Sequence, residues 1–247
     1  MKLALVTDLH ANREAVSAVL AHAAAQGAQR YAFLGDYVGY GADPGWVIDT
    51  VREHVARGAL AVLGNHDAAV LHGAPATMTA DARTGADWTR ARLDPGQLGF
   101  LAALPVSVAE GELFFVHANA WAPTEWEYIT GRGDAVRSLH ATACRITFCG
   151  HMHVPMLYHL TGAGKSGDFT PTPRVAIPLS VQRRWLVLPG STGQPRDGNP
   201  AACYAMFDTA HQALTFHRIA YDHDAAGAKI RAAGLPPQLA ERLTHGE

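Results

Sequence analysis

The sequence is poor in lysine and cysteine and contains no long apolar run. Lysine occurs three times in 247 residues and the formal net charge is −2, so a nucleic-acid binder held by bulk positive charge is not expected. The three cysteines, Cys144, Cys149 and Cys203, form no CxxC pair. This pattern argues against a disulfide framework and favours buried free thiols.

No apolar stretch approaches the roughly 18 residues of a membrane span, and no signal-peptide pattern is present. We therefore expect a cytoplasmic protein without a membrane segment. The length and a hydrophobic content of 48% suit a single domain over residues 1–247 that can bury a sizeable core. Histidine is the unusual residue, with 14 copies, several of which follow strand-like segments.

Short apolar runs alternate with helical patterns in the first part of the chain. Strands are predicted over residues 3–6, 31–34 and 60–63, and helices over residues 13–25 and 44–55. This β-α-β-α-β order is typical of a mostly parallel sheet. Ligands of such sheets bind beyond the carboxyl ends of the strands.

The pattern changes in the second part. Two further helices are predicted over residues 80–93 and 95–101, and a last helical segment over 224–243 has a break at residues 236–237. Strand-like runs joined mostly by turns predict a second, more antiparallel sheet; they span residues 106–108, 113–116, 146–149, 156–160, 175–179, 185–188, 202–207 and 214–219. We expect an α/β fold, a four-layer α/β/β/α sandwich of two mixed sheets flanked by helices.

Polar side chains follow the predicted strands. A lone Asp after a strand is usually a cap or turn residue, and a lone His usually packs in the fold, but so many at strand ends indicate a metal site. They are Asp8 and His10 in "LVTDLHAN", Asp36 in "LGDYVG", Asn65 and His66 in "LGNHD", His117 in "FFVHA", and His151 and His153 in "CGHMH".

The donor types indicate the kind of metal. Nitrogen and oxygen donors without thiolate favour Mn²⁺, Fe or Zn²⁺ over a closed structural zinc site. Seven candidate ligands are too many for one tetrahedral ion, so we expect two divalent ions that share a bridging carboxylate. Such a pair clamps a phosphoryl group and activates a water as hydroxide for in-line attack.

The order DxH, GD, GNH[DE], a single His after a strand, and GHxH over residues 2–191 resembles that of the calcineurin-like metallophosphoesterases. "DYVGYGADP", "EYI" and "GSTGQPRDGNP" are similar to the small prokaryotic phosphodiesterase-like branch. The resemblance implies that His66 stabilises the transition state or protonates the leaving oxygen. It implies the following metal ligands: Asp8, His10 and His153 for one ion, Asn65, His117 and His151 for the other, and Asp36 for both.

The sequence departs from the protein phosphatases of this family at one motif. They carry GDxxDRG, whereas here Gly39 and Tyr40 take the places of the second Asp and the phosphate-gripping Arg. This departure argues against a phosphoprotein phosphatase. We expect Arg196 to supply positive charge to the substrate instead; the alternative is that Arg196 pairs with Asp197 or Asp208 and orders its loop.

Three further stretches have two interpretations each. Trp126 and Tyr128, with Trp121, either form an aromatic wall for a nucleobase or aryl ester or pack their loop onto the core. Asn12 either touches phosphate or caps the helix that starts at residue 13, and the cap is favoured. "TGAGKSGD", residues 161–168, lacks the spacing and the following helix of a P-loop and is interpreted as a hairpin tip.

The predicted function is hydrolysis of P–O bonds by metal-activated hydroxide, with phosphodiesters or nucleotide-type pyrophosphates as substrates. One alternative is a phosphomonoesterase or protein phosphatase. An alternative of another class is a non-catalytic interaction scaffold of the same fold, which the complete set of ligand positions disfavours. The expected partner is a small phosphate ester or nucleotide, and a homodimer is expected from base rates alone.

Overall fold

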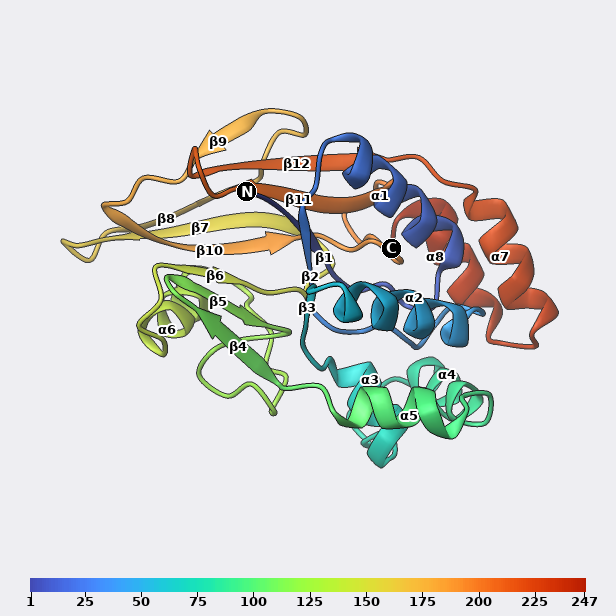
Figure 1. Ribbon diagram of the computed structural model, residues 1–247. Helices are drawn as coiled ribbons and strands as arrows, with labels where there is room; N and C mark the ends of the chain where they lie inside the picture. Colours follow the sequence, from blue (N-terminus) through green and yellow to red (C-terminus); the bar gives the residue numbers. More distant parts are fainter.

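A computed structural model describes all residues from 1 to 247 and contains two six-stranded mixed sheets (Figure 1). Sheet A has the order β3-β2-β1-β11-β12-β9 and sheet B the order β4-β5-β6-β10-β7-β8. The strands of sheet A are β1 (Lys2–Val6), β2 (Arg30–Phe33), β3 (Leu60–Ala61), β9 (Ala176–Pro178), β11 (Ala202–Asp208) and β12 (Ala213–Ile219). Those of sheet B are β4 (Ser107–Glu110), β5 (Leu113–Val116), β6 (Ile146–Phe148), β7 (Pro155–Thr161), β8 (Ser166–Phe169) and β10 (Arg183–Pro189).

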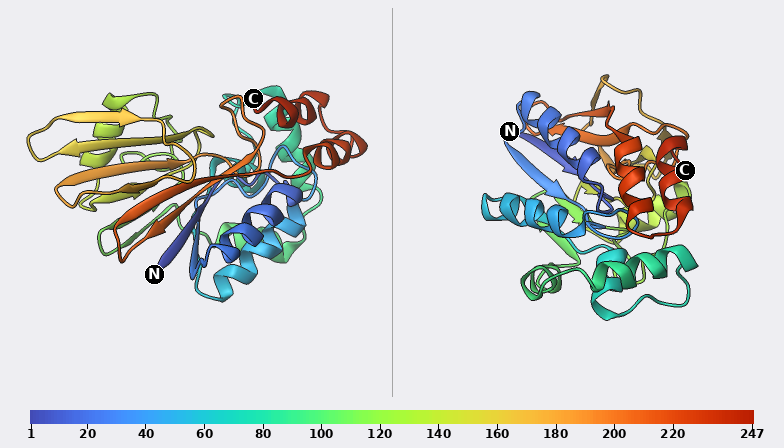
Figure 2. Two further views of the ribbon diagram at one scale, coloured as in Figure 1. Left: turned by 90° about the horizontal axis from the view of Figure 1, so that it is seen from above. Right: turned by 90° about the vertical axis from the view of Figure 1, so that its right-hand side faces the viewer.

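Eight helices flank the two sheets. In Figure 1, α6 lies beside sheet B, apart from the other helices, and Figure 2 shows α1 and α2 side by side along sheet A. The helices are α1 (Arg13–Ala25), α2 (Pro44–Ala56), α3 (Asn65–His72), α4 (Ala80–Arg90), α5 (Pro95–Ala102), α6 (Arg132–His140), α7 (His223–Ala232) and α8 (Pro237–His245).

Strand β1 shows how the sequence makes four layers. Leu3 and Leu5 point into an apolar core between the sheets, together with Phe148 and Val187 of sheet B. Ala4 and Val6 point to the opposite face, where α1 and α2 cover sheet A, because side chains alternate along a strand. A strand buried on both faces therefore reads as a continuous apolar run. The predicted four-layer sandwich is confirmed.

One part of the sheet prediction is wrong. The strands at 175–179, 202–207 and 214–219 were expected in the second sheet. Instead, β11 pairs antiparallel with β1, β12 pairs with β11, and β9 pairs with β12, all in sheet A. Burial on both faces of β11 would suit a central strand of either sheet, so its pairing with β1 decides the sheet. Phe207 faces the core between the sheets, and Tyr204 faces the helices, so this strand fits the centre of a sheet and not its edge.

Several element boundaries also differ. Helices α3 and α6 and strand β8 were not predicted, α4 ends three residues early, and β3 has two residues. The break at residues 236–237 is confirmed, since α8 begins at Pro237. The hairpin at 161–168 is confirmed by antiparallel pairing of β7 and β8. All three cysteines are buried and free, and none of the helices combines the length and apolarity needed to cross a membrane.

Candidate metal centre

The polar motifs meet where β1, β2, β3, β5 and β6 end. Seven residues, here called the ligand cluster, are Asp8, His10, Asp36, Asn65, His117, His151 and His153. Five of them have positive φ, between 46° for His10 and 67° for His151. Left-handed backbone is costly for residues other than glycine and concentrates at functional sites. The chain is therefore turned sharply after each strand so that these side chains converge.

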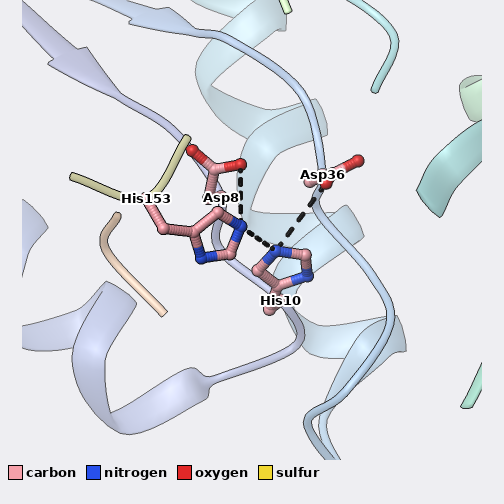
Figure 3. A group of neighbouring side chains, drawn as sticks. All are labelled: Asp8, His10, Asp36 and His153. Atoms are coloured by element: carbon pink, nitrogen blue, oxygen red, sulfur yellow. Dashed lines mark hydrogen bonds and ion pairs between the residues drawn. The ribbon is translucent and has the colours of Figure 1, made fainter. Parts of the chain in front are cut away.

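The first half of the cluster contains Asp8, His10, Asp36 and His153 (Figure 3). His10 Nε2 lies 3.1 Å from His153 Nε2 and 3.7 Å from Asp36 Oδ2. His153 Nε2 lies 3.4 Å from Asp8 Oδ1. All four side chains are buried, so one ion could contact all four donors.

The second half contains Asp36, His117 and His151, whose ligand atoms also lie within 4.8 Å of one another. His117 Nε2 lies 3.3 Å from Asp36 Oδ2 and 3.0 Å from Asn65 Oδ1. Asp36 Oδ1 accepts a hydrogen bond of 2.8 Å from the main-chain N–H of His66. Its other oxygen, Oδ2, therefore lies between the two halves, where a bridging carboxylate would have to be.

The histidine rings are oriented by main-chain carbonyl groups. Each ring directs one nitrogen to a carbonyl and the other toward the cluster, an orientation that fixes the tautomer of a neutral ring and is usual for metal-binding histidines. The pairs are His10 Nδ1 with Val38 O at 3.0 Å, His117 Nδ1 with Leu34 O at 2.7 Å, His151 Nε2 with Trp126 O at 2.9 Å, and His153 Nδ1 with Gln194 O at 2.6 Å.

The orientation of the His10 and His153 rings shows whether these donors fit a metal ion. With both Nδ1 atoms protonated, the facing Nε2 atoms of His10 and His153 carry lone pairs and no proton, so their 3.1 Å separation is repulsive without a cation. Burial lowers the pKa of both rings, which keeps them neutral. Neutral imidazole nitrogens beside carboxylates are the donor set of a divalent transition metal, so the residues fit.

The charges of the cluster agree with this. Burial raises the pKa of Asp8 to about 7. Burial also acts against ionisation of Asp36, but His117, His66 and His10 hold the pKa of Asp36 well below its usual range. The Asp36 carboxylate in turn overcomes the burial of His117 and raises the pKa of that ring to about 9. Without an ion, the His117 ring therefore carries a proton beside the Asp36 carboxylate, and a bound divalent ion would take the place of that proton.

Asp67 is a residue of the site that the sequence analysis missed. Its carboxylate accepts hydrogen bonds of 2.9 Å from the main-chain N–H groups of Asp36, Tyr37 and Gly64. It thereby ties the loop of Asp36 to the start of α3, which carries Asn65 and His66. The fourth position of "GNHD" was the available signal, since an acidic residue at the third position of a helix commonly accepts N–H groups of its own cap.

His66 lies beside the cluster without being part of it. Its ring centroid is 4.5 Å from that of Tyr40 and 5.0 Å from that of His10, and its buried Nδ1 has no hydrogen-bond partner. Gly39, with a φ of 83°, passes so close that a Cβ would lie 2.5 Å from this Nδ1. Glycine at position 39 thus makes room for the ring where the phosphatases carry Asp.

Arg196 does not make the ion pairs considered for it. Asp197 pairs with Arg218, and Asp208 pairs with His211. The guanidinium of Arg196 instead donates to Gln194 Oε1 at 3.0 Å and to the hydroxyl of Tyr40 at 3.3 Å. The structure therefore excludes the alternative in which Arg196 pairs with a carboxylate.

Of the other residues predicted to contact substrate, Asn12 is used inside the fold, whereas Trp126 and Tyr128 face a cavity. Asn12 Oδ1 accepts from Ala15 N and caps α1, and its NH₂ donates to Gly193 O, so both polar ends are used inside the fold and no phosphate contact is supported. Trp126 and Tyr128 line a cavity. Tyr128 is 51% exposed and stacks on the ring of His151 at 4.1 Å.

A cavity of about 840 Å³ reaches the ligand cluster at Asn65. His66, Arg196, Trp126 and Tyr128 also line it. A volume of this order accommodates a ligand of nucleotide size.

A family model, the calcineurin-like phosphoesterase superfamily domain, matches residues 1–212. The chain belongs to the calcineurin-like phosphoesterase superfamily. It is accordingly a metal-dependent phosphoesterase, a hydrolase. An uncharacterized protein of Methanocaldococcus jannaschii is 33% identical over 99% of this chain and 98% of its own length.

Solved structures agree with the family assignment. A metallophosphoesterase from Sphaerobacter thermophilus is 33% identical, covers 100% of both chains and superposes with a TM-score of 0.88. A hypothetical protein from Pyrococcus horikoshii OT3 is 17% identical, with 100% of this chain and 98% of its own covered and a TM-score of 0.78. The second similarity shows the shared fold alone.

Proposed function

We propose that this phosphoesterase is a two-metal enzyme that hydrolyses phosphodiesters or nucleotide-type pyrophosphates. The observation that carries the proposal is the position of Asp36 Oδ2, 3.3 Å from His117 Nε2 and 3.7 Å from His10 Nε2. One carboxylate oxygen thus serves two groups of buried donors, as in binuclear phosphoesterases. The cavity above them offers room for both ester groups of a diester.

The proposed ligands follow from the two groups. Asp8, His10 and His153 hold one ion, Asn65, His117 and His151 hold the other, and Asp36 bridges both. Two divalent ions bound there supply charge neutralisation for phosphoryl oxygens and a water of lowered pKa. The nitrogen and oxygen donors suit Mn²⁺, Fe or Zn²⁺.

The residues around the ions have separate tasks. His66 faces the cavity from the start of α3 and stabilises the transition state or protonates the leaving oxygen. The Arg196 guanidinium binds a phosphate oxygen. Trp126 and Tyr128 support the leaving group by stacking.

A diester is favoured over a phosphoprotein by the replacement of the phosphatase Asp and Arg by Gly39 and Tyr40. The hydroxyl of Tyr40 is 3.3 Å from Arg196 Nη2, so positive charge reaches the cavity from another loop than in those phosphatases. A phosphomonoesterase is the second candidate, and a non-catalytic scaffold is disfavoured by the complete donor set. A cytoplasmic location and a homodimer stay predictions.

The test compares hydrolysis of bis-p-nitrophenyl phosphate with that of p-nitrophenyl phosphate, with Mn²⁺ added and after removal of metal by a chelator. We expect faster diester turnover that disappears with the metal and returns on its addition. Faster turnover of the monoester would replace the diesterase proposal by the monoesterase. No turnover of either ester with two ions bound would contradict both and favour a scaffold.

A further inference from the structure

A second arginine lines the cavity. Arg242 belongs to the last turn of α8 and shares the cavity with Arg196 and His66. It is half-buried, and its guanidinium makes no ion pair and no hydrogen bond, whereas Arg83 and Arg90 of α4 donate to main-chain carbonyls. A partly desolvated guanidinium that has no partner is available for an anion.

The end of α8 is fixed relative to the Arg196 loop. Gly198 N donates to Gly246 O at 3.0 Å. Gly246 ends the helix with a φ of 70°, and a Cβ there would lie 2.6 Å from the main chain of Asn199. This close main-chain contact needs glycine. It holds the two arginine-bearing segments together at one side of the cavity.

A second contact fixes α8 to the floor of the cavity. Leu239 and Leu243 of α8 pack in one apolar cluster with Tyr40 and with Ala82 of α4. The indole N–H of Trp88 donates to a main-chain carbonyl in the turn between α7 and α8, at 3.1 Å. Arg242 therefore projects from a rigid helix and not from a mobile loop, which favours a defined binding position.

Acidic groups near Arg242 do not neutralise it. Glu125 and Glu247 also line the cavity and are exposed, but neither lies within ion-pair distance of Arg242. The arginines of the cavity are thus Arg196, whose charge acts on Asp8 and His10, and Arg242 at the end of α8. Two arginines from different segments of one cavity suit a ligand that carries two phosphates.

We propose that Arg242 forms a second anion subsite and that the natural substrate is a phosphoric anhydride of the nucleoside polyphosphate class. The phosphoryl group to be cleaved lies over the ligand cluster and Arg196, and a further phosphate of the same chain binds the Arg242 guanidinium. The position of the cleaved group rests on the proposed function. The anion subsite itself depends on Arg242 alone.

The experiment measures direct binding by calorimetry, with inorganic phosphate and inorganic tripolyphosphate as probes and Mn²⁺ in excess over each anion. We expect the ratio of tripolyphosphate to phosphate affinity to fall about tenfold in Arg242→Ala, since charge-assisted hydrogen bonds to phosphate are strong. Arg242→Lys should recover part of that ratio. Arg231→Ala removes an equal charge from exposed α7, outside the cavity, and should leave the ratio unchanged.

The outcomes separate the subsite from the proposed function. Equal ratios in wild type and Arg242→Ala, or an equal loss in Arg231→Ala, would overturn the subsite even where bis-p-nitrophenyl phosphate is hydrolysed. A tenfold fall of the ratio in a protein that hydrolyses neither nitrophenyl ester would leave the subsite intact and contradict the proposed function. Thermal unfolding of each variant checks that α8 remains in place.

Discussion

The ligand cluster and the cavity wall are built in different ways. The cluster is buried, lies at strand ends and is oriented by main-chain groups, such as Val38 O for His10 and Gln194 O for His153. The wall, formed by Trp126, Tyr128, Arg196 and Arg242, consists of half-buried or exposed side chains. Main-chain groups orient the metal-binding side chains, whereas the side chains of the wall are the ones that can meet different substrates.

The largest effect is expected for Asp36→Asn, which tests the cluster at its shared oxygen. The amide keeps the shape of the side chain and its bond from His66 N but removes the shared negative charge. We expect loss of at least one ion and a fall in diester turnover of about 10³-fold or more. Metal content after dialysis and initial rates at saturating Mn²⁺ are the measurements.

The control is Asp208→Asn, which changes an equal charge at the surface end of β11, where Asp208 pairs with His211. It should keep both ions and the wild-type rate. If Asp36→Asn kept two ions and a rate within tenfold of wild type, Asp36 would not be the bridging ligand.

Gly39→Ala tests the role of His66, which lies between the ligand cluster and the cavity wall. The methyl group would meet His66 Nδ1 at 2.5 Å, so the ring must move. We expect kcat to fall about 10²-fold, a typical cost of a lost acid–base group, with metal content unchanged. Gly58→Ala is the matched control, because Gly58 has a φ of 94° and open space around it.

Both glycine variants carry the strain of a left-handed alanine, about 1–2 kcal/mol, and Gly39→Ala adds the displacement of His66, so it should lose at least as much thermal stability as Gly58→Ala. Only Gly39→Ala should lose activity. Equal activity losses would mean that backbone strain, and not displacement of His66, causes the effect.

The difference between the ligand cluster and the cavity wall also explains what the sequence could predict. Each motif of the cluster follows a recognisable apolar strand, so the meeting point of Asp8, Asp36 and His117 follows from the order of a parallel sheet. Asp67 was missed because its partners are main-chain N–H groups, which the sequence does not display. The cavity wall was harder to predict, because Arg196 and Arg242 are far apart in the chain. Their two segments come together through the contact of Gly198 with Gly246.

The sheet assignment failed for a related reason. The strand at 202–207 has the same apolar character whichever sheet it joins, and only its pairing with β1 decides. Long-range pairing of this kind leaves no local signal in the sequence. By contrast, α1 was predicted at its observed bounds, because its cap Asn12 and its apolar spacing are local.

Arg196→Ala should have an intermediate effect. The side chain lines the cavity and has only neutral partners, Gln194 and Tyr40, so its charge is free to bind phosphate. We expect KM for bis-p-nitrophenyl phosphate to rise about tenfold. Arg57→Ala, which removes a surface charge just after the end of α2, serves as the control, and an unchanged KM in Arg196→Ala would exclude a contact of Arg196 with substrate.

The smallest effect is expected for Tyr128→Ala, which decides between an aromatic wall and simple loop packing. The ring stacks on His151 with an interplanar angle of 14° and is 51% exposed, so its outer face is open to a base. A stacked base contributes about 1–3 kcal/mol. We therefore expect kcat/KM for thymidine 5′-(p-nitrophenyl phosphate) to fall about fivefold or more, and that for methyl p-nitrophenyl phosphate to change little.

Tyr128→Phe is the matched variant, since it keeps the ring and should retain wild-type rates on both esters. Metal content must be measured alongside, because Tyr128 touches a proposed ligand. A loss that is equal on both esters, together with a loss of metal, would assign Tyr128 to the support of His151. Tyr128 would then belong with the metal-binding residues. Of the two aromatic side chains of the wall, only Trp126 would remain as a candidate for substrate recognition.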